Sequence, residues 1–201
     1  MKYKLTDETK NFCGKVLHRI VCVTAFASVS VGDTGGWVES EKNLSQYGNA
    51  WVSGNAEVYG DACVSGNACV SGDAEVSGNA WVYGDAEVSG DARVYGDAWV
   101  YGNAWVSGDA EVSGNARVYG DAEVSGDAEV SKSSDYAVYK NTWSSMRYFT
   151  WTRSNDKWRV GCFFGTGGEL IEKAYKDSKL SGDCYKAVVE LRKKLTELES
   201  A

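Results

Sequence analysis

The sequence is short of the residues on which many catalytic and metal sites depend. Histidine occurs once in 201 residues, as His18, and no two cysteines stand in a Cys-x-x-Cys arrangement. A zinc site built from cysteine and histidine is therefore not expected. His18 has no recognisable partner for a role as a catalytic base, and we interpret it as a strand residue near the N-terminus.

Long apolar segments are also missing. The longest apolar-leaning run, Ile20–Val31, contains Ser and Thr and is far shorter than the roughly 20 residues of a membrane span. The opening residues Met1–Leu5 lack the apolar core of an export signal. We therefore expect no membrane association and a cytoplasmic protein whose six cysteines are free thiols.

One short repeat dominates the middle of the sequence. From Gly48 to Ser131 it runs through fourteen consecutive six-residue units, Gly-(Asn/Asp)-Ala-x-Val-(Ser/Tyr), without insertion or deletion. Proline is absent, and most of the 23 glycines fall in these units, where they predict turns and not a flexible linker. Because strand side chains alternate, the constant Ala and Val are expected inside and the variable residue x outside. A fixed period of this kind predicts a solenoid.

The spacing within the repeat points to a family. Val followed four residues later by Ala, as in Val52 and Ala56 or Val58 and Ala62, resembles the hexapeptide motif of the left-handed parallel β-helix proteins. The resemblance covers residues 48–131 and implies a mainly β fold, a single-stranded left-handed parallel β-helix with three units, or about 18 residues, per coil. A two-sided solenoid of about twelve residues per coil is the alternative.

The repeat divides the chain into three parts. Residues 1–47 predict an N-terminal β cap with the first irregular coil, residues 48–131 the β-helix, and residues 132–201 a small C-terminal α/β domain. In the cap we expect strands at 16–23 and 27–31 and a turn cluster at 32–36. Val38 and Leu44 are expected to continue the inward column of Ala50.

The C-terminal part predicts a β-hairpin and two helices. Residues 147–152 and 158–164 read as its strands, and Thr166 with Glu169 forms a capping box for a helix over 168–178. A second helix is expected to start near Asp183. Its apolar stripe is expected to be core or an oligomer seam, and it consists of Cys184, Val188, Leu191, Leu195 and Leu198.

The 18-residue period sorts the outward residues into three faces. The first is small and plain. The second is acidic, and we interpret it as a solvated face, with calcium binding as the alternative. The third is aromatic and is the main candidate binding or oligomer surface; it consists of Trp81, Tyr83, Trp99, Tyr101, Arg117 and Tyr119. Such a patch favours a homo-oligomer contact; packing by the C-terminal segment and stacking of a planar ligand or partner are the alternatives.

A second binding candidate lies in the predicted hairpin, where basic residues stand among aromatic ones. Such mixtures can bind single-stranded nucleic acid or nucleotides, whereas the alternative is a hairpin stabilised by its aromatic pairs. The repeat carries eight Asp and six Glu against two Arg, which disfavours a long polyanion. Nucleic acid is therefore not expected as a partner, although a small nucleotide is a candidate. The residues concerned are Arg147, Trp151, Arg153, Lys157, Trp158 and Arg159.

Residues 2–9, 32–45 and 158–178, together with the repeat, make the chain similar to hexapeptide-repeat proteins of phage and prophage genomes of gut bacteria. The resemblance implies a phage origin and a setting in the host cytoplasm. It does not indicate an activity. From the aromatic surfaces and the lack of histidine in the repeat we expect a non-catalytic binding or scaffold protein, a dimer or trimer, without a cofactor or metal. An inhibitor of host defence, which binds a host protein or sequesters a nucleotide signal, is the expectation.

An enzyme is the rival expectation. Hexapeptide β-helix proteins include acyltransferases that use acetyl-CoA and rely on a histidine base, usually presented from a coil or a loop extruded from one. Residues 48–131 contain no histidine and no inserted loop. Acyltransferase activity is therefore disfavoured.

Overall fold

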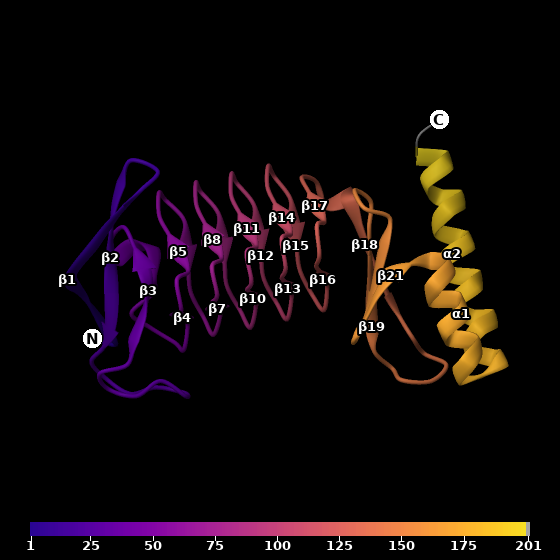
Figure 1. Cartoon of the computed structure of the whole chain (residues 1–201), viewed down its shortest axis with the longest axis horizontal. Coiled ribbons are helices and arrows are strands. Elements are labelled where there is room, and N and C mark those ends of the chain that lie inside the picture. Colours follow the sequence, from indigo (N-terminus) through magenta and orange to yellow (C-terminus); the bar gives the residue numbers. More distant parts are fainter. Residues whose placement is uncertain (200–201) are drawn as a thin grey trace.

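The repeat forms a three-sided parallel β-solenoid that lies between two unlike caps (Figure 1). A computed structural model describes residues 1–199. Strands near the N-terminus cover one end of the rod, and a four-stranded sheet followed by two helices covers the other (Figure 1).

Each repeat unit contributes one two-residue strand, formed by x and Val. A strand pairs in parallel with the strand one coil further, as Trp81 does with Trp99 and Val82 with Val100. This 18-residue register excludes the twelve-residue alternative. The strands are β4 Trp51–Val52, β7 Cys69–Val70, β10 Glu87–Val88, β13 Trp105–Val106 and β16 Glu123–Val124 on the first face; β5 Glu57–Val58, β8 Glu75–Val76, β11 Arg93–Val94, β14 Glu111–Val112 and β17 Glu129–Val130 on the second; and β6 Cys63–Val64, β9 Trp81–Val82, β12 Trp99–Val100 and β15 Arg117–Val118 on the third.

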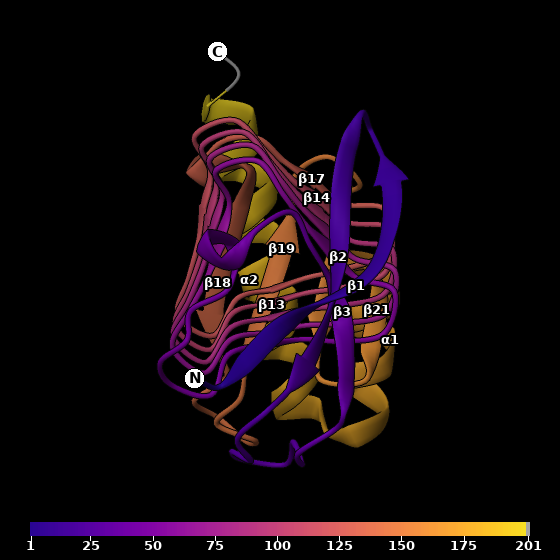
Figure 2. The same cartoon turned by 90° about the vertical axis from the view of Figure 1, so that its left-hand side faces the viewer.

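The core of the rod is made of the constant residues. All fourteen Ala and all fourteen Val of the repeat are 0% exposed, which confirms their inward assignment. The coils superimpose when the rod is viewed from its N-terminal end, so each face is continuous from coil to coil (Figure 2).

Backbone and side-chain hydrogen bonds join successive coils at the corners. The Asn55 N–H donates to the Gly72 carbonyl (2.8 Å), and the Asn55 side-chain amide donates to Asp73 Oδ1 (2.9 Å). Gly84 shows why the corner needs glycine: its φ is +76°, and a Cβ would lie 3.0 Å from the Gly102 nitrogen of the next coil.

The N-terminal cap extends the sheet of the second face. Strands β1 (Tyr3–Phe12) and β2 (Lys15–Cys22) form an antiparallel hairpin, and β3 (Thr34–Val38) links β2 to β5. A short 3-10 helix, η1 (Glu41–Asn43), follows. The resulting eight-stranded sheet runs β1-β2-β3-β5-β8-β11-β14-β17.

The structure corrects three details of the predicted cap. Residues 27–31 are not a strand, because the chain turns at Ala27 (φ +43°) and Phe26 bridges back to Val29. Residues 34–36 of the predicted turn cluster at 32–36 belong instead to strand β3, which begins at Thr34. Val38 and Leu44 are buried as expected, but they pair with Val58 and Val64 and so continue the valine column and not that of Ala50.

Polar side chains satisfy the carbonyl groups that the first coil presents to the cap. Lys2 Nζ donates to the Ala50 carbonyl (2.7 Å), Arg19 Nη1 to that of Gly54 (2.9 Å) and Asn43 Nδ2 to that of Ala62 (2.8 Å). Burial lowers the pKa of Lys2 to about 8.

The C-terminal part is a four-stranded antiparallel sheet with two helices on its outer face (Figure 1). It comprises the 3-10 helix η2 (Ser133–Asp135), the strands β18 (Tyr136–Lys140), β19 (Tyr148–Thr152), β20 (Lys157–Val160) and β21 (Phe163–Thr166), and the helices α1 (Gly167–Asp177) and α2 (Lys179–Glu199). The capping box of Thr166 and Glu169 is present as predicted. The predicted strand 158–164 is two strands, because the chain turns at Gly161 (φ +56°).

Helix α2 begins earlier than predicted and is rotated relative to the predicted stripe. Its buried face contains Gly182, Tyr185, Val189 and Arg192, whereas Leu191 is 50% exposed. Gly182 sets this rotation, since a Cβ there would stand 2.1 Å from the Tyr175 ring of α1. The core interpretation of the stripe is therefore wrong for Leu191 and Leu198, whereas Val188 does pack against the core of the domain. The oligomer seam stays a prediction. The members of that stripe that are strongly exposed are Leu191 and Leu198.

The last coil presents backbone N–H groups to the C-terminal cap, and hydroxyl groups accept them. On each face the N–H of one outward residue donates to a hydroxyl of the cap. These pairs are Arg117 N–H with Ser133 Oγ (3.2 Å), Glu123 N–H with Thr150 Oγ1 (2.8 Å) and Glu129 N–H with Ser154 Oγ (2.7 Å).

Neither α1 nor α2 combines the length and the apolar composition that a transmembrane helix needs. The six cysteines all carry free thiols.

Candidate functional site

The third face carries a ladder of stacked side chains, which we call the aromatic ladder (Trp81, Tyr83, Trp99, Tyr101, Arg117 and Tyr119). Trp81 and Trp99 pair in register on β9 and β12, so their rings stack at 6.0 Å between centroids and 23° between planes. The Arg117 guanidinium continues this column 5.0 Å from the Trp99 ring centroid. The coil period therefore brings the predicted residues together.

A parallel column of tyrosines lies beside the tryptophans. Tyr83 and Tyr101 stack at 4.9 Å and 1°, and Tyr101 and Tyr119 at 5.3 Å and 13°. Partial burial, followed by the proximity of Tyr101, raises the pKa of Tyr83. The Tyr83 hydroxyl is therefore a neutral donor or acceptor near pH 7.

The aromatic ladder is preformed and open. Trp81 is 46% exposed and Tyr119 51% exposed, so both ends of the ladder are accessible. The C-terminal domain covers the end of the rod and reaches this face only beside its last strand. There Ser133 Oγ accepts the Arg117 N–H (3.2 Å) and the Tyr136 hydroxyl donates to the Arg117 carbonyl (2.9 Å). Packing of the C-terminal segment over the ladder, one of the alternatives, is therefore excluded.

The acidic second face is partly neutralised by its own neighbours. Lys10 pairs with Glu57, Tyr59 donates to Glu75, and Arg93 Nη1 lies 3.5 Å from Glu111 Oε1. Within residues 1–199, no group of three or more His, Cys, Asp or Glu side chains is arranged to hold a metal ion. Nothing in this geometry favours the calcium alternative.

His18 lies on β2 of the N-terminal cap. Its Nδ1 is 3.2 Å from the Thr6 carbonyl oxygen of β1, which ties the ring to the hairpin. This position is at the end of the rod, away from the aromatic ladder.

The residues of the second predicted site, in the C-terminal hairpin, are divided between the two sides of the C-terminal sheet. Trp151 and Trp158 pair directly across β19 and β20 and are buried against the helices. Arg159 points to the opposite side, where its Nε lies 3.1 Å from Glu123 Oε2 of the rod. The single basic–aromatic surface predicted from Arg147, Lys157 and their neighbours is therefore wrong, because adjacent strand residues face opposite sides of the sheet.

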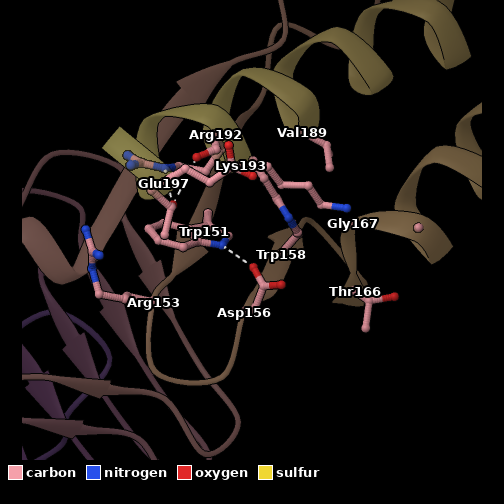
Figure 3. A pocket seen from close by; sticks show the side chains of 12 residues that line it. Trp151, Arg153, Asp156, Trp158, Thr166, Gly167, Val189, Arg192, Lys193 and Glu197 are labelled. Carbon is pink, nitrogen blue, oxygen red and sulfur yellow. Dashed lines mark hydrogen bonds between the residues drawn. The ribbon is translucent and has the colours of Figure 1, made fainter. Parts of the chain in front are cut away.

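Part of that set does line a pocket of about 350 Å³ between the sheet and α2 (Figure 3). The Trp151 Nε1–H donates to Asp156 Oδ1 (2.7 Å). The guanidinium carbons of Arg192 and Arg153 lie 4.7 and 5.7 Å from the Trp151 ring centroid.

Glu199 joins the two arginines beside this pocket. Arg192 Nη2 lies 2.7 Å from Glu199 Oε1, and Arg153 pairs with Oε2 of the same carboxylate. Hydrogen bonds from Arg192 and then Arg153 lower the pKa of Glu199. Sequence reasoning missed Arg192, because a charged residue on the buried face of a helix leaves no periodic signal.

Comparison with known proteins concerns the repeat. Residues 86–102 and 110–126 match the family model for the YdcK beta solenoid repeat. No curated protein matches the chain. The two matched segments lie within the rod and cover far less than half of the chain. They include four residues of the aromatic ladder: Trp99, Tyr101, Arg117 and Tyr119. The match therefore supports the solenoid and leaves the function to the exposed surfaces.

Proposed function

We propose that this chain is a non-catalytic binding and scaffold protein that associates with copies of itself through the aromatic ladder. The observation that carries the proposal is that the ladder is preformed and left open by the rest of the chain. Trp, Tyr and Arg are the residue types that contribute most to protein interfaces. Self-association by a closed symmetry reuses one such patch on every copy, and the product is a dimer or trimer.

The non-catalytic part of the proposal is supported by the position of the only histidine. His18 is bonded within the N-terminal hairpin, and the repeat units follow one another without an inserted loop. An acyltransferase of this fold would need its histidine base in a coil or in a loop inserted between coils.

The biological setting that we propose is a phage protein in the host cytoplasm. The resemblance of residues 2–9, 32–45 and 158–178 to phage hexapeptide-repeat proteins supports it. In this setting the assembled protein inhibits host defence by binding a host protein or by sequestering a nucleotide signal.

The test is the mass of the assembly in solution. Light scattering of the wild-type protein is expected to give a multiple of 21.8 kDa. The double variant Trp81→Ala/Trp99→Ala is expected to give the monomer with an unchanged circular dichroism spectrum, because both side chains point away from the core.

Trp105→Ala is the matched control, since Trp105 is 41% exposed on the first face, outside the ladder. Its mass is expected to equal that of the wild type. A monomeric wild type, or a double variant of unchanged mass, would contradict assembly through the ladder.

A further inference from the structure

The pocket between the C-terminal sheet and the helices is lined by an indole N–H to which the described part of the chain offers no acceptor. Trp158 is 2% exposed, yet no residue among 1–199 accepts a hydrogen bond from its Nε1–H. The nitrogen lies beside the start of α1, 3.2 Å from where a Cβ on Gly167 would stand. Since the rest of this side chain is buried, its N–H is available only to a group that enters the pocket.

The start of α1 adds two backbone donors to the same pocket. Thr166 Oγ1 accepts the Glu169 N–H (3.3 Å), and Glu169 Oε2 accepts the Thr166 N–H (2.8 Å). This capping box leaves the N–H groups of Gly167 and Gly168, the first two helical residues, without an acceptor inside the helix. Both glycines line the pocket. Such N–H groups carry the partial positive charge of the helix start.

Lys193 supplies an available positive charge at the pocket. It lies on α2 among the lining residues (Figure 3), and it makes no ion pair within the described part of the chain. The two arginines differ from it, because Arg192 and Arg153 are both bound to Glu199. The donors of Trp158, α1 and Lys193 thus line one pocket with apolar walls that include Val189.

We propose that this pocket binds a small organic anion through its carboxylate or phosphate group. The anionic group accepts hydrogen bonds from Trp158 Nε1–H and the α1 N–H groups, and Lys193 balances its charge. A volume of about 350 Å³ fits a small metabolite. Asp156 and Glu197 also line the pocket and repel additional negative charge, so the ligand carries a single anionic group.

The site lies on the C-terminal domain and does not depend on the aromatic ladder. Sodium phosphate and sodium acetate are the probes, each titrated at constant ionic strength. The readout is the indole N–H signal of Trp158 in a ¹H–¹⁵N NMR spectrum, identified among those of the eight tryptophans by its absence in Trp158→Phe. We expect this signal to shift and saturate, and the anion that saturates it at the lower concentration identifies the chemical group.

Two variants test the contacts without disturbing the fold. Lys193→Gln removes the charge and is expected to raise the apparent Kd at least about threefold. Gly168→Ala places a methyl group beside the proposed anion, and the structure has room for it, since the nearest atom is Thr166 Oγ1 at 4.0 Å. It is expected to weaken binding as well.

Lys194→Gln, which removes a neighbouring charge outside the pocket, is the control and should leave the Kd unchanged. The proposal is overturned if neither anion moves the Trp158 signal up to about 0.1 M, where screening already suppresses weak surface attraction. It is also overturned if Lys193→Gln has the same apparent Kd as the wild type and the Lys194→Gln control. The mass of the assembly is measured separately, so failure here leaves the proposed self-association untouched.

Discussion

At the scale of single residues, the corner glycines meet two constraints that can be separated. One is the positive φ, and the other is the lack of space for a side chain against the next coil. Both act at Gly84, whereas Gly120 in the last coil has φ +69° and no atom within 4 Å of a Cβ position. The pair therefore distinguishes backbone strain from the close stacking of coils.

We expect Gly84→Ala to lower the free energy of unfolding more than Gly120→Ala. Each loses about 1–2 kcal/mol from the left-handed backbone conformation. The new methyl group of Gly84→Ala must also displace the Gly102 backbone 3.0 Å away. Urea denaturation of both variants measures the difference, and equal losses would show that coil contact is not what selects glycine.

Residue-level prediction succeeded where one period governs both sequence and structure. The inward Ala and Val and the partners within the aromatic ladder follow from strand alternation and the coil length alone, as the pairing of Trp81 with Trp99 shows. It failed for Trp151 and Trp158, which looked like binding residues and are core. Composition does not reveal which side of a sheet becomes buried.

At the scale of elements, α2 shows why an apolar stripe does not determine the buried face. The row that includes Leu191 and Leu198 is the more apolar one, yet Tyr185, Val189 and Arg192 face the sheet. The close approach of Tyr175 to Gly182 fixes the rotation, and that contact depends on how the two helices cross. Information of this kind is absent from a local sequence pattern.

Two substitutions on α2 test this orientation. Val189→Ala removes a buried side chain that packs on Gly167, and we expect a loss of about 1.5–3 kcal/mol of unfolding free energy, the value of burying such a side chain. Leu191→Ala, on the exposed row, is expected to change it by no more than about 0.5 kcal/mol. Thermal or urea unfolding at low protein concentration measures both, and a larger loss for Leu191→Ala would mean that the helix is rotated the other way.

At the scale of the whole molecule, the two ends of the rod pose opposite problems. The first coil presents carbonyl groups, which Lys2, Arg19 and Asn43 satisfy, and the last coil presents N–H groups, which three hydroxyls accept. The sequence predicts a cap at the N-terminal end of the rod, but it does not predict which side chains bond to the backbone at either end. A Ser or Thr in a loop has no periodic neighbour that marks its role.

Thr150→Val is the sharpest test of the C-terminal seal. Valine keeps the shape of this buried side chain but leaves the Glu123 N–H without its acceptor, which is expected to cost about 1–3 kcal/mol. Hydrogen exchange should show faster exchange of the Glu123 amide.

Ser154→Ala is the matched variant, because Ser154 accepts the Glu129 N–H on another face. It should accelerate exchange at Glu129 and not at Glu123. If both variants accelerate both amides equally, the end of the rod opens as one unit and the hydroxyls do not act face by face.

The three hydroxyl contacts also bear on how the gene of such a protein can change in length. Duplication of a whole coil returns every later residue to its own face, so the ladder grows by one step and Ser133, Thr150 and Ser154 still meet their N–H partners. Duplication of a single six-residue unit turns everything downstream by one face and presents each cap hydroxyl with the wrong strand. Inherited insertions and deletions in relatives of this rod should therefore come in whole coils.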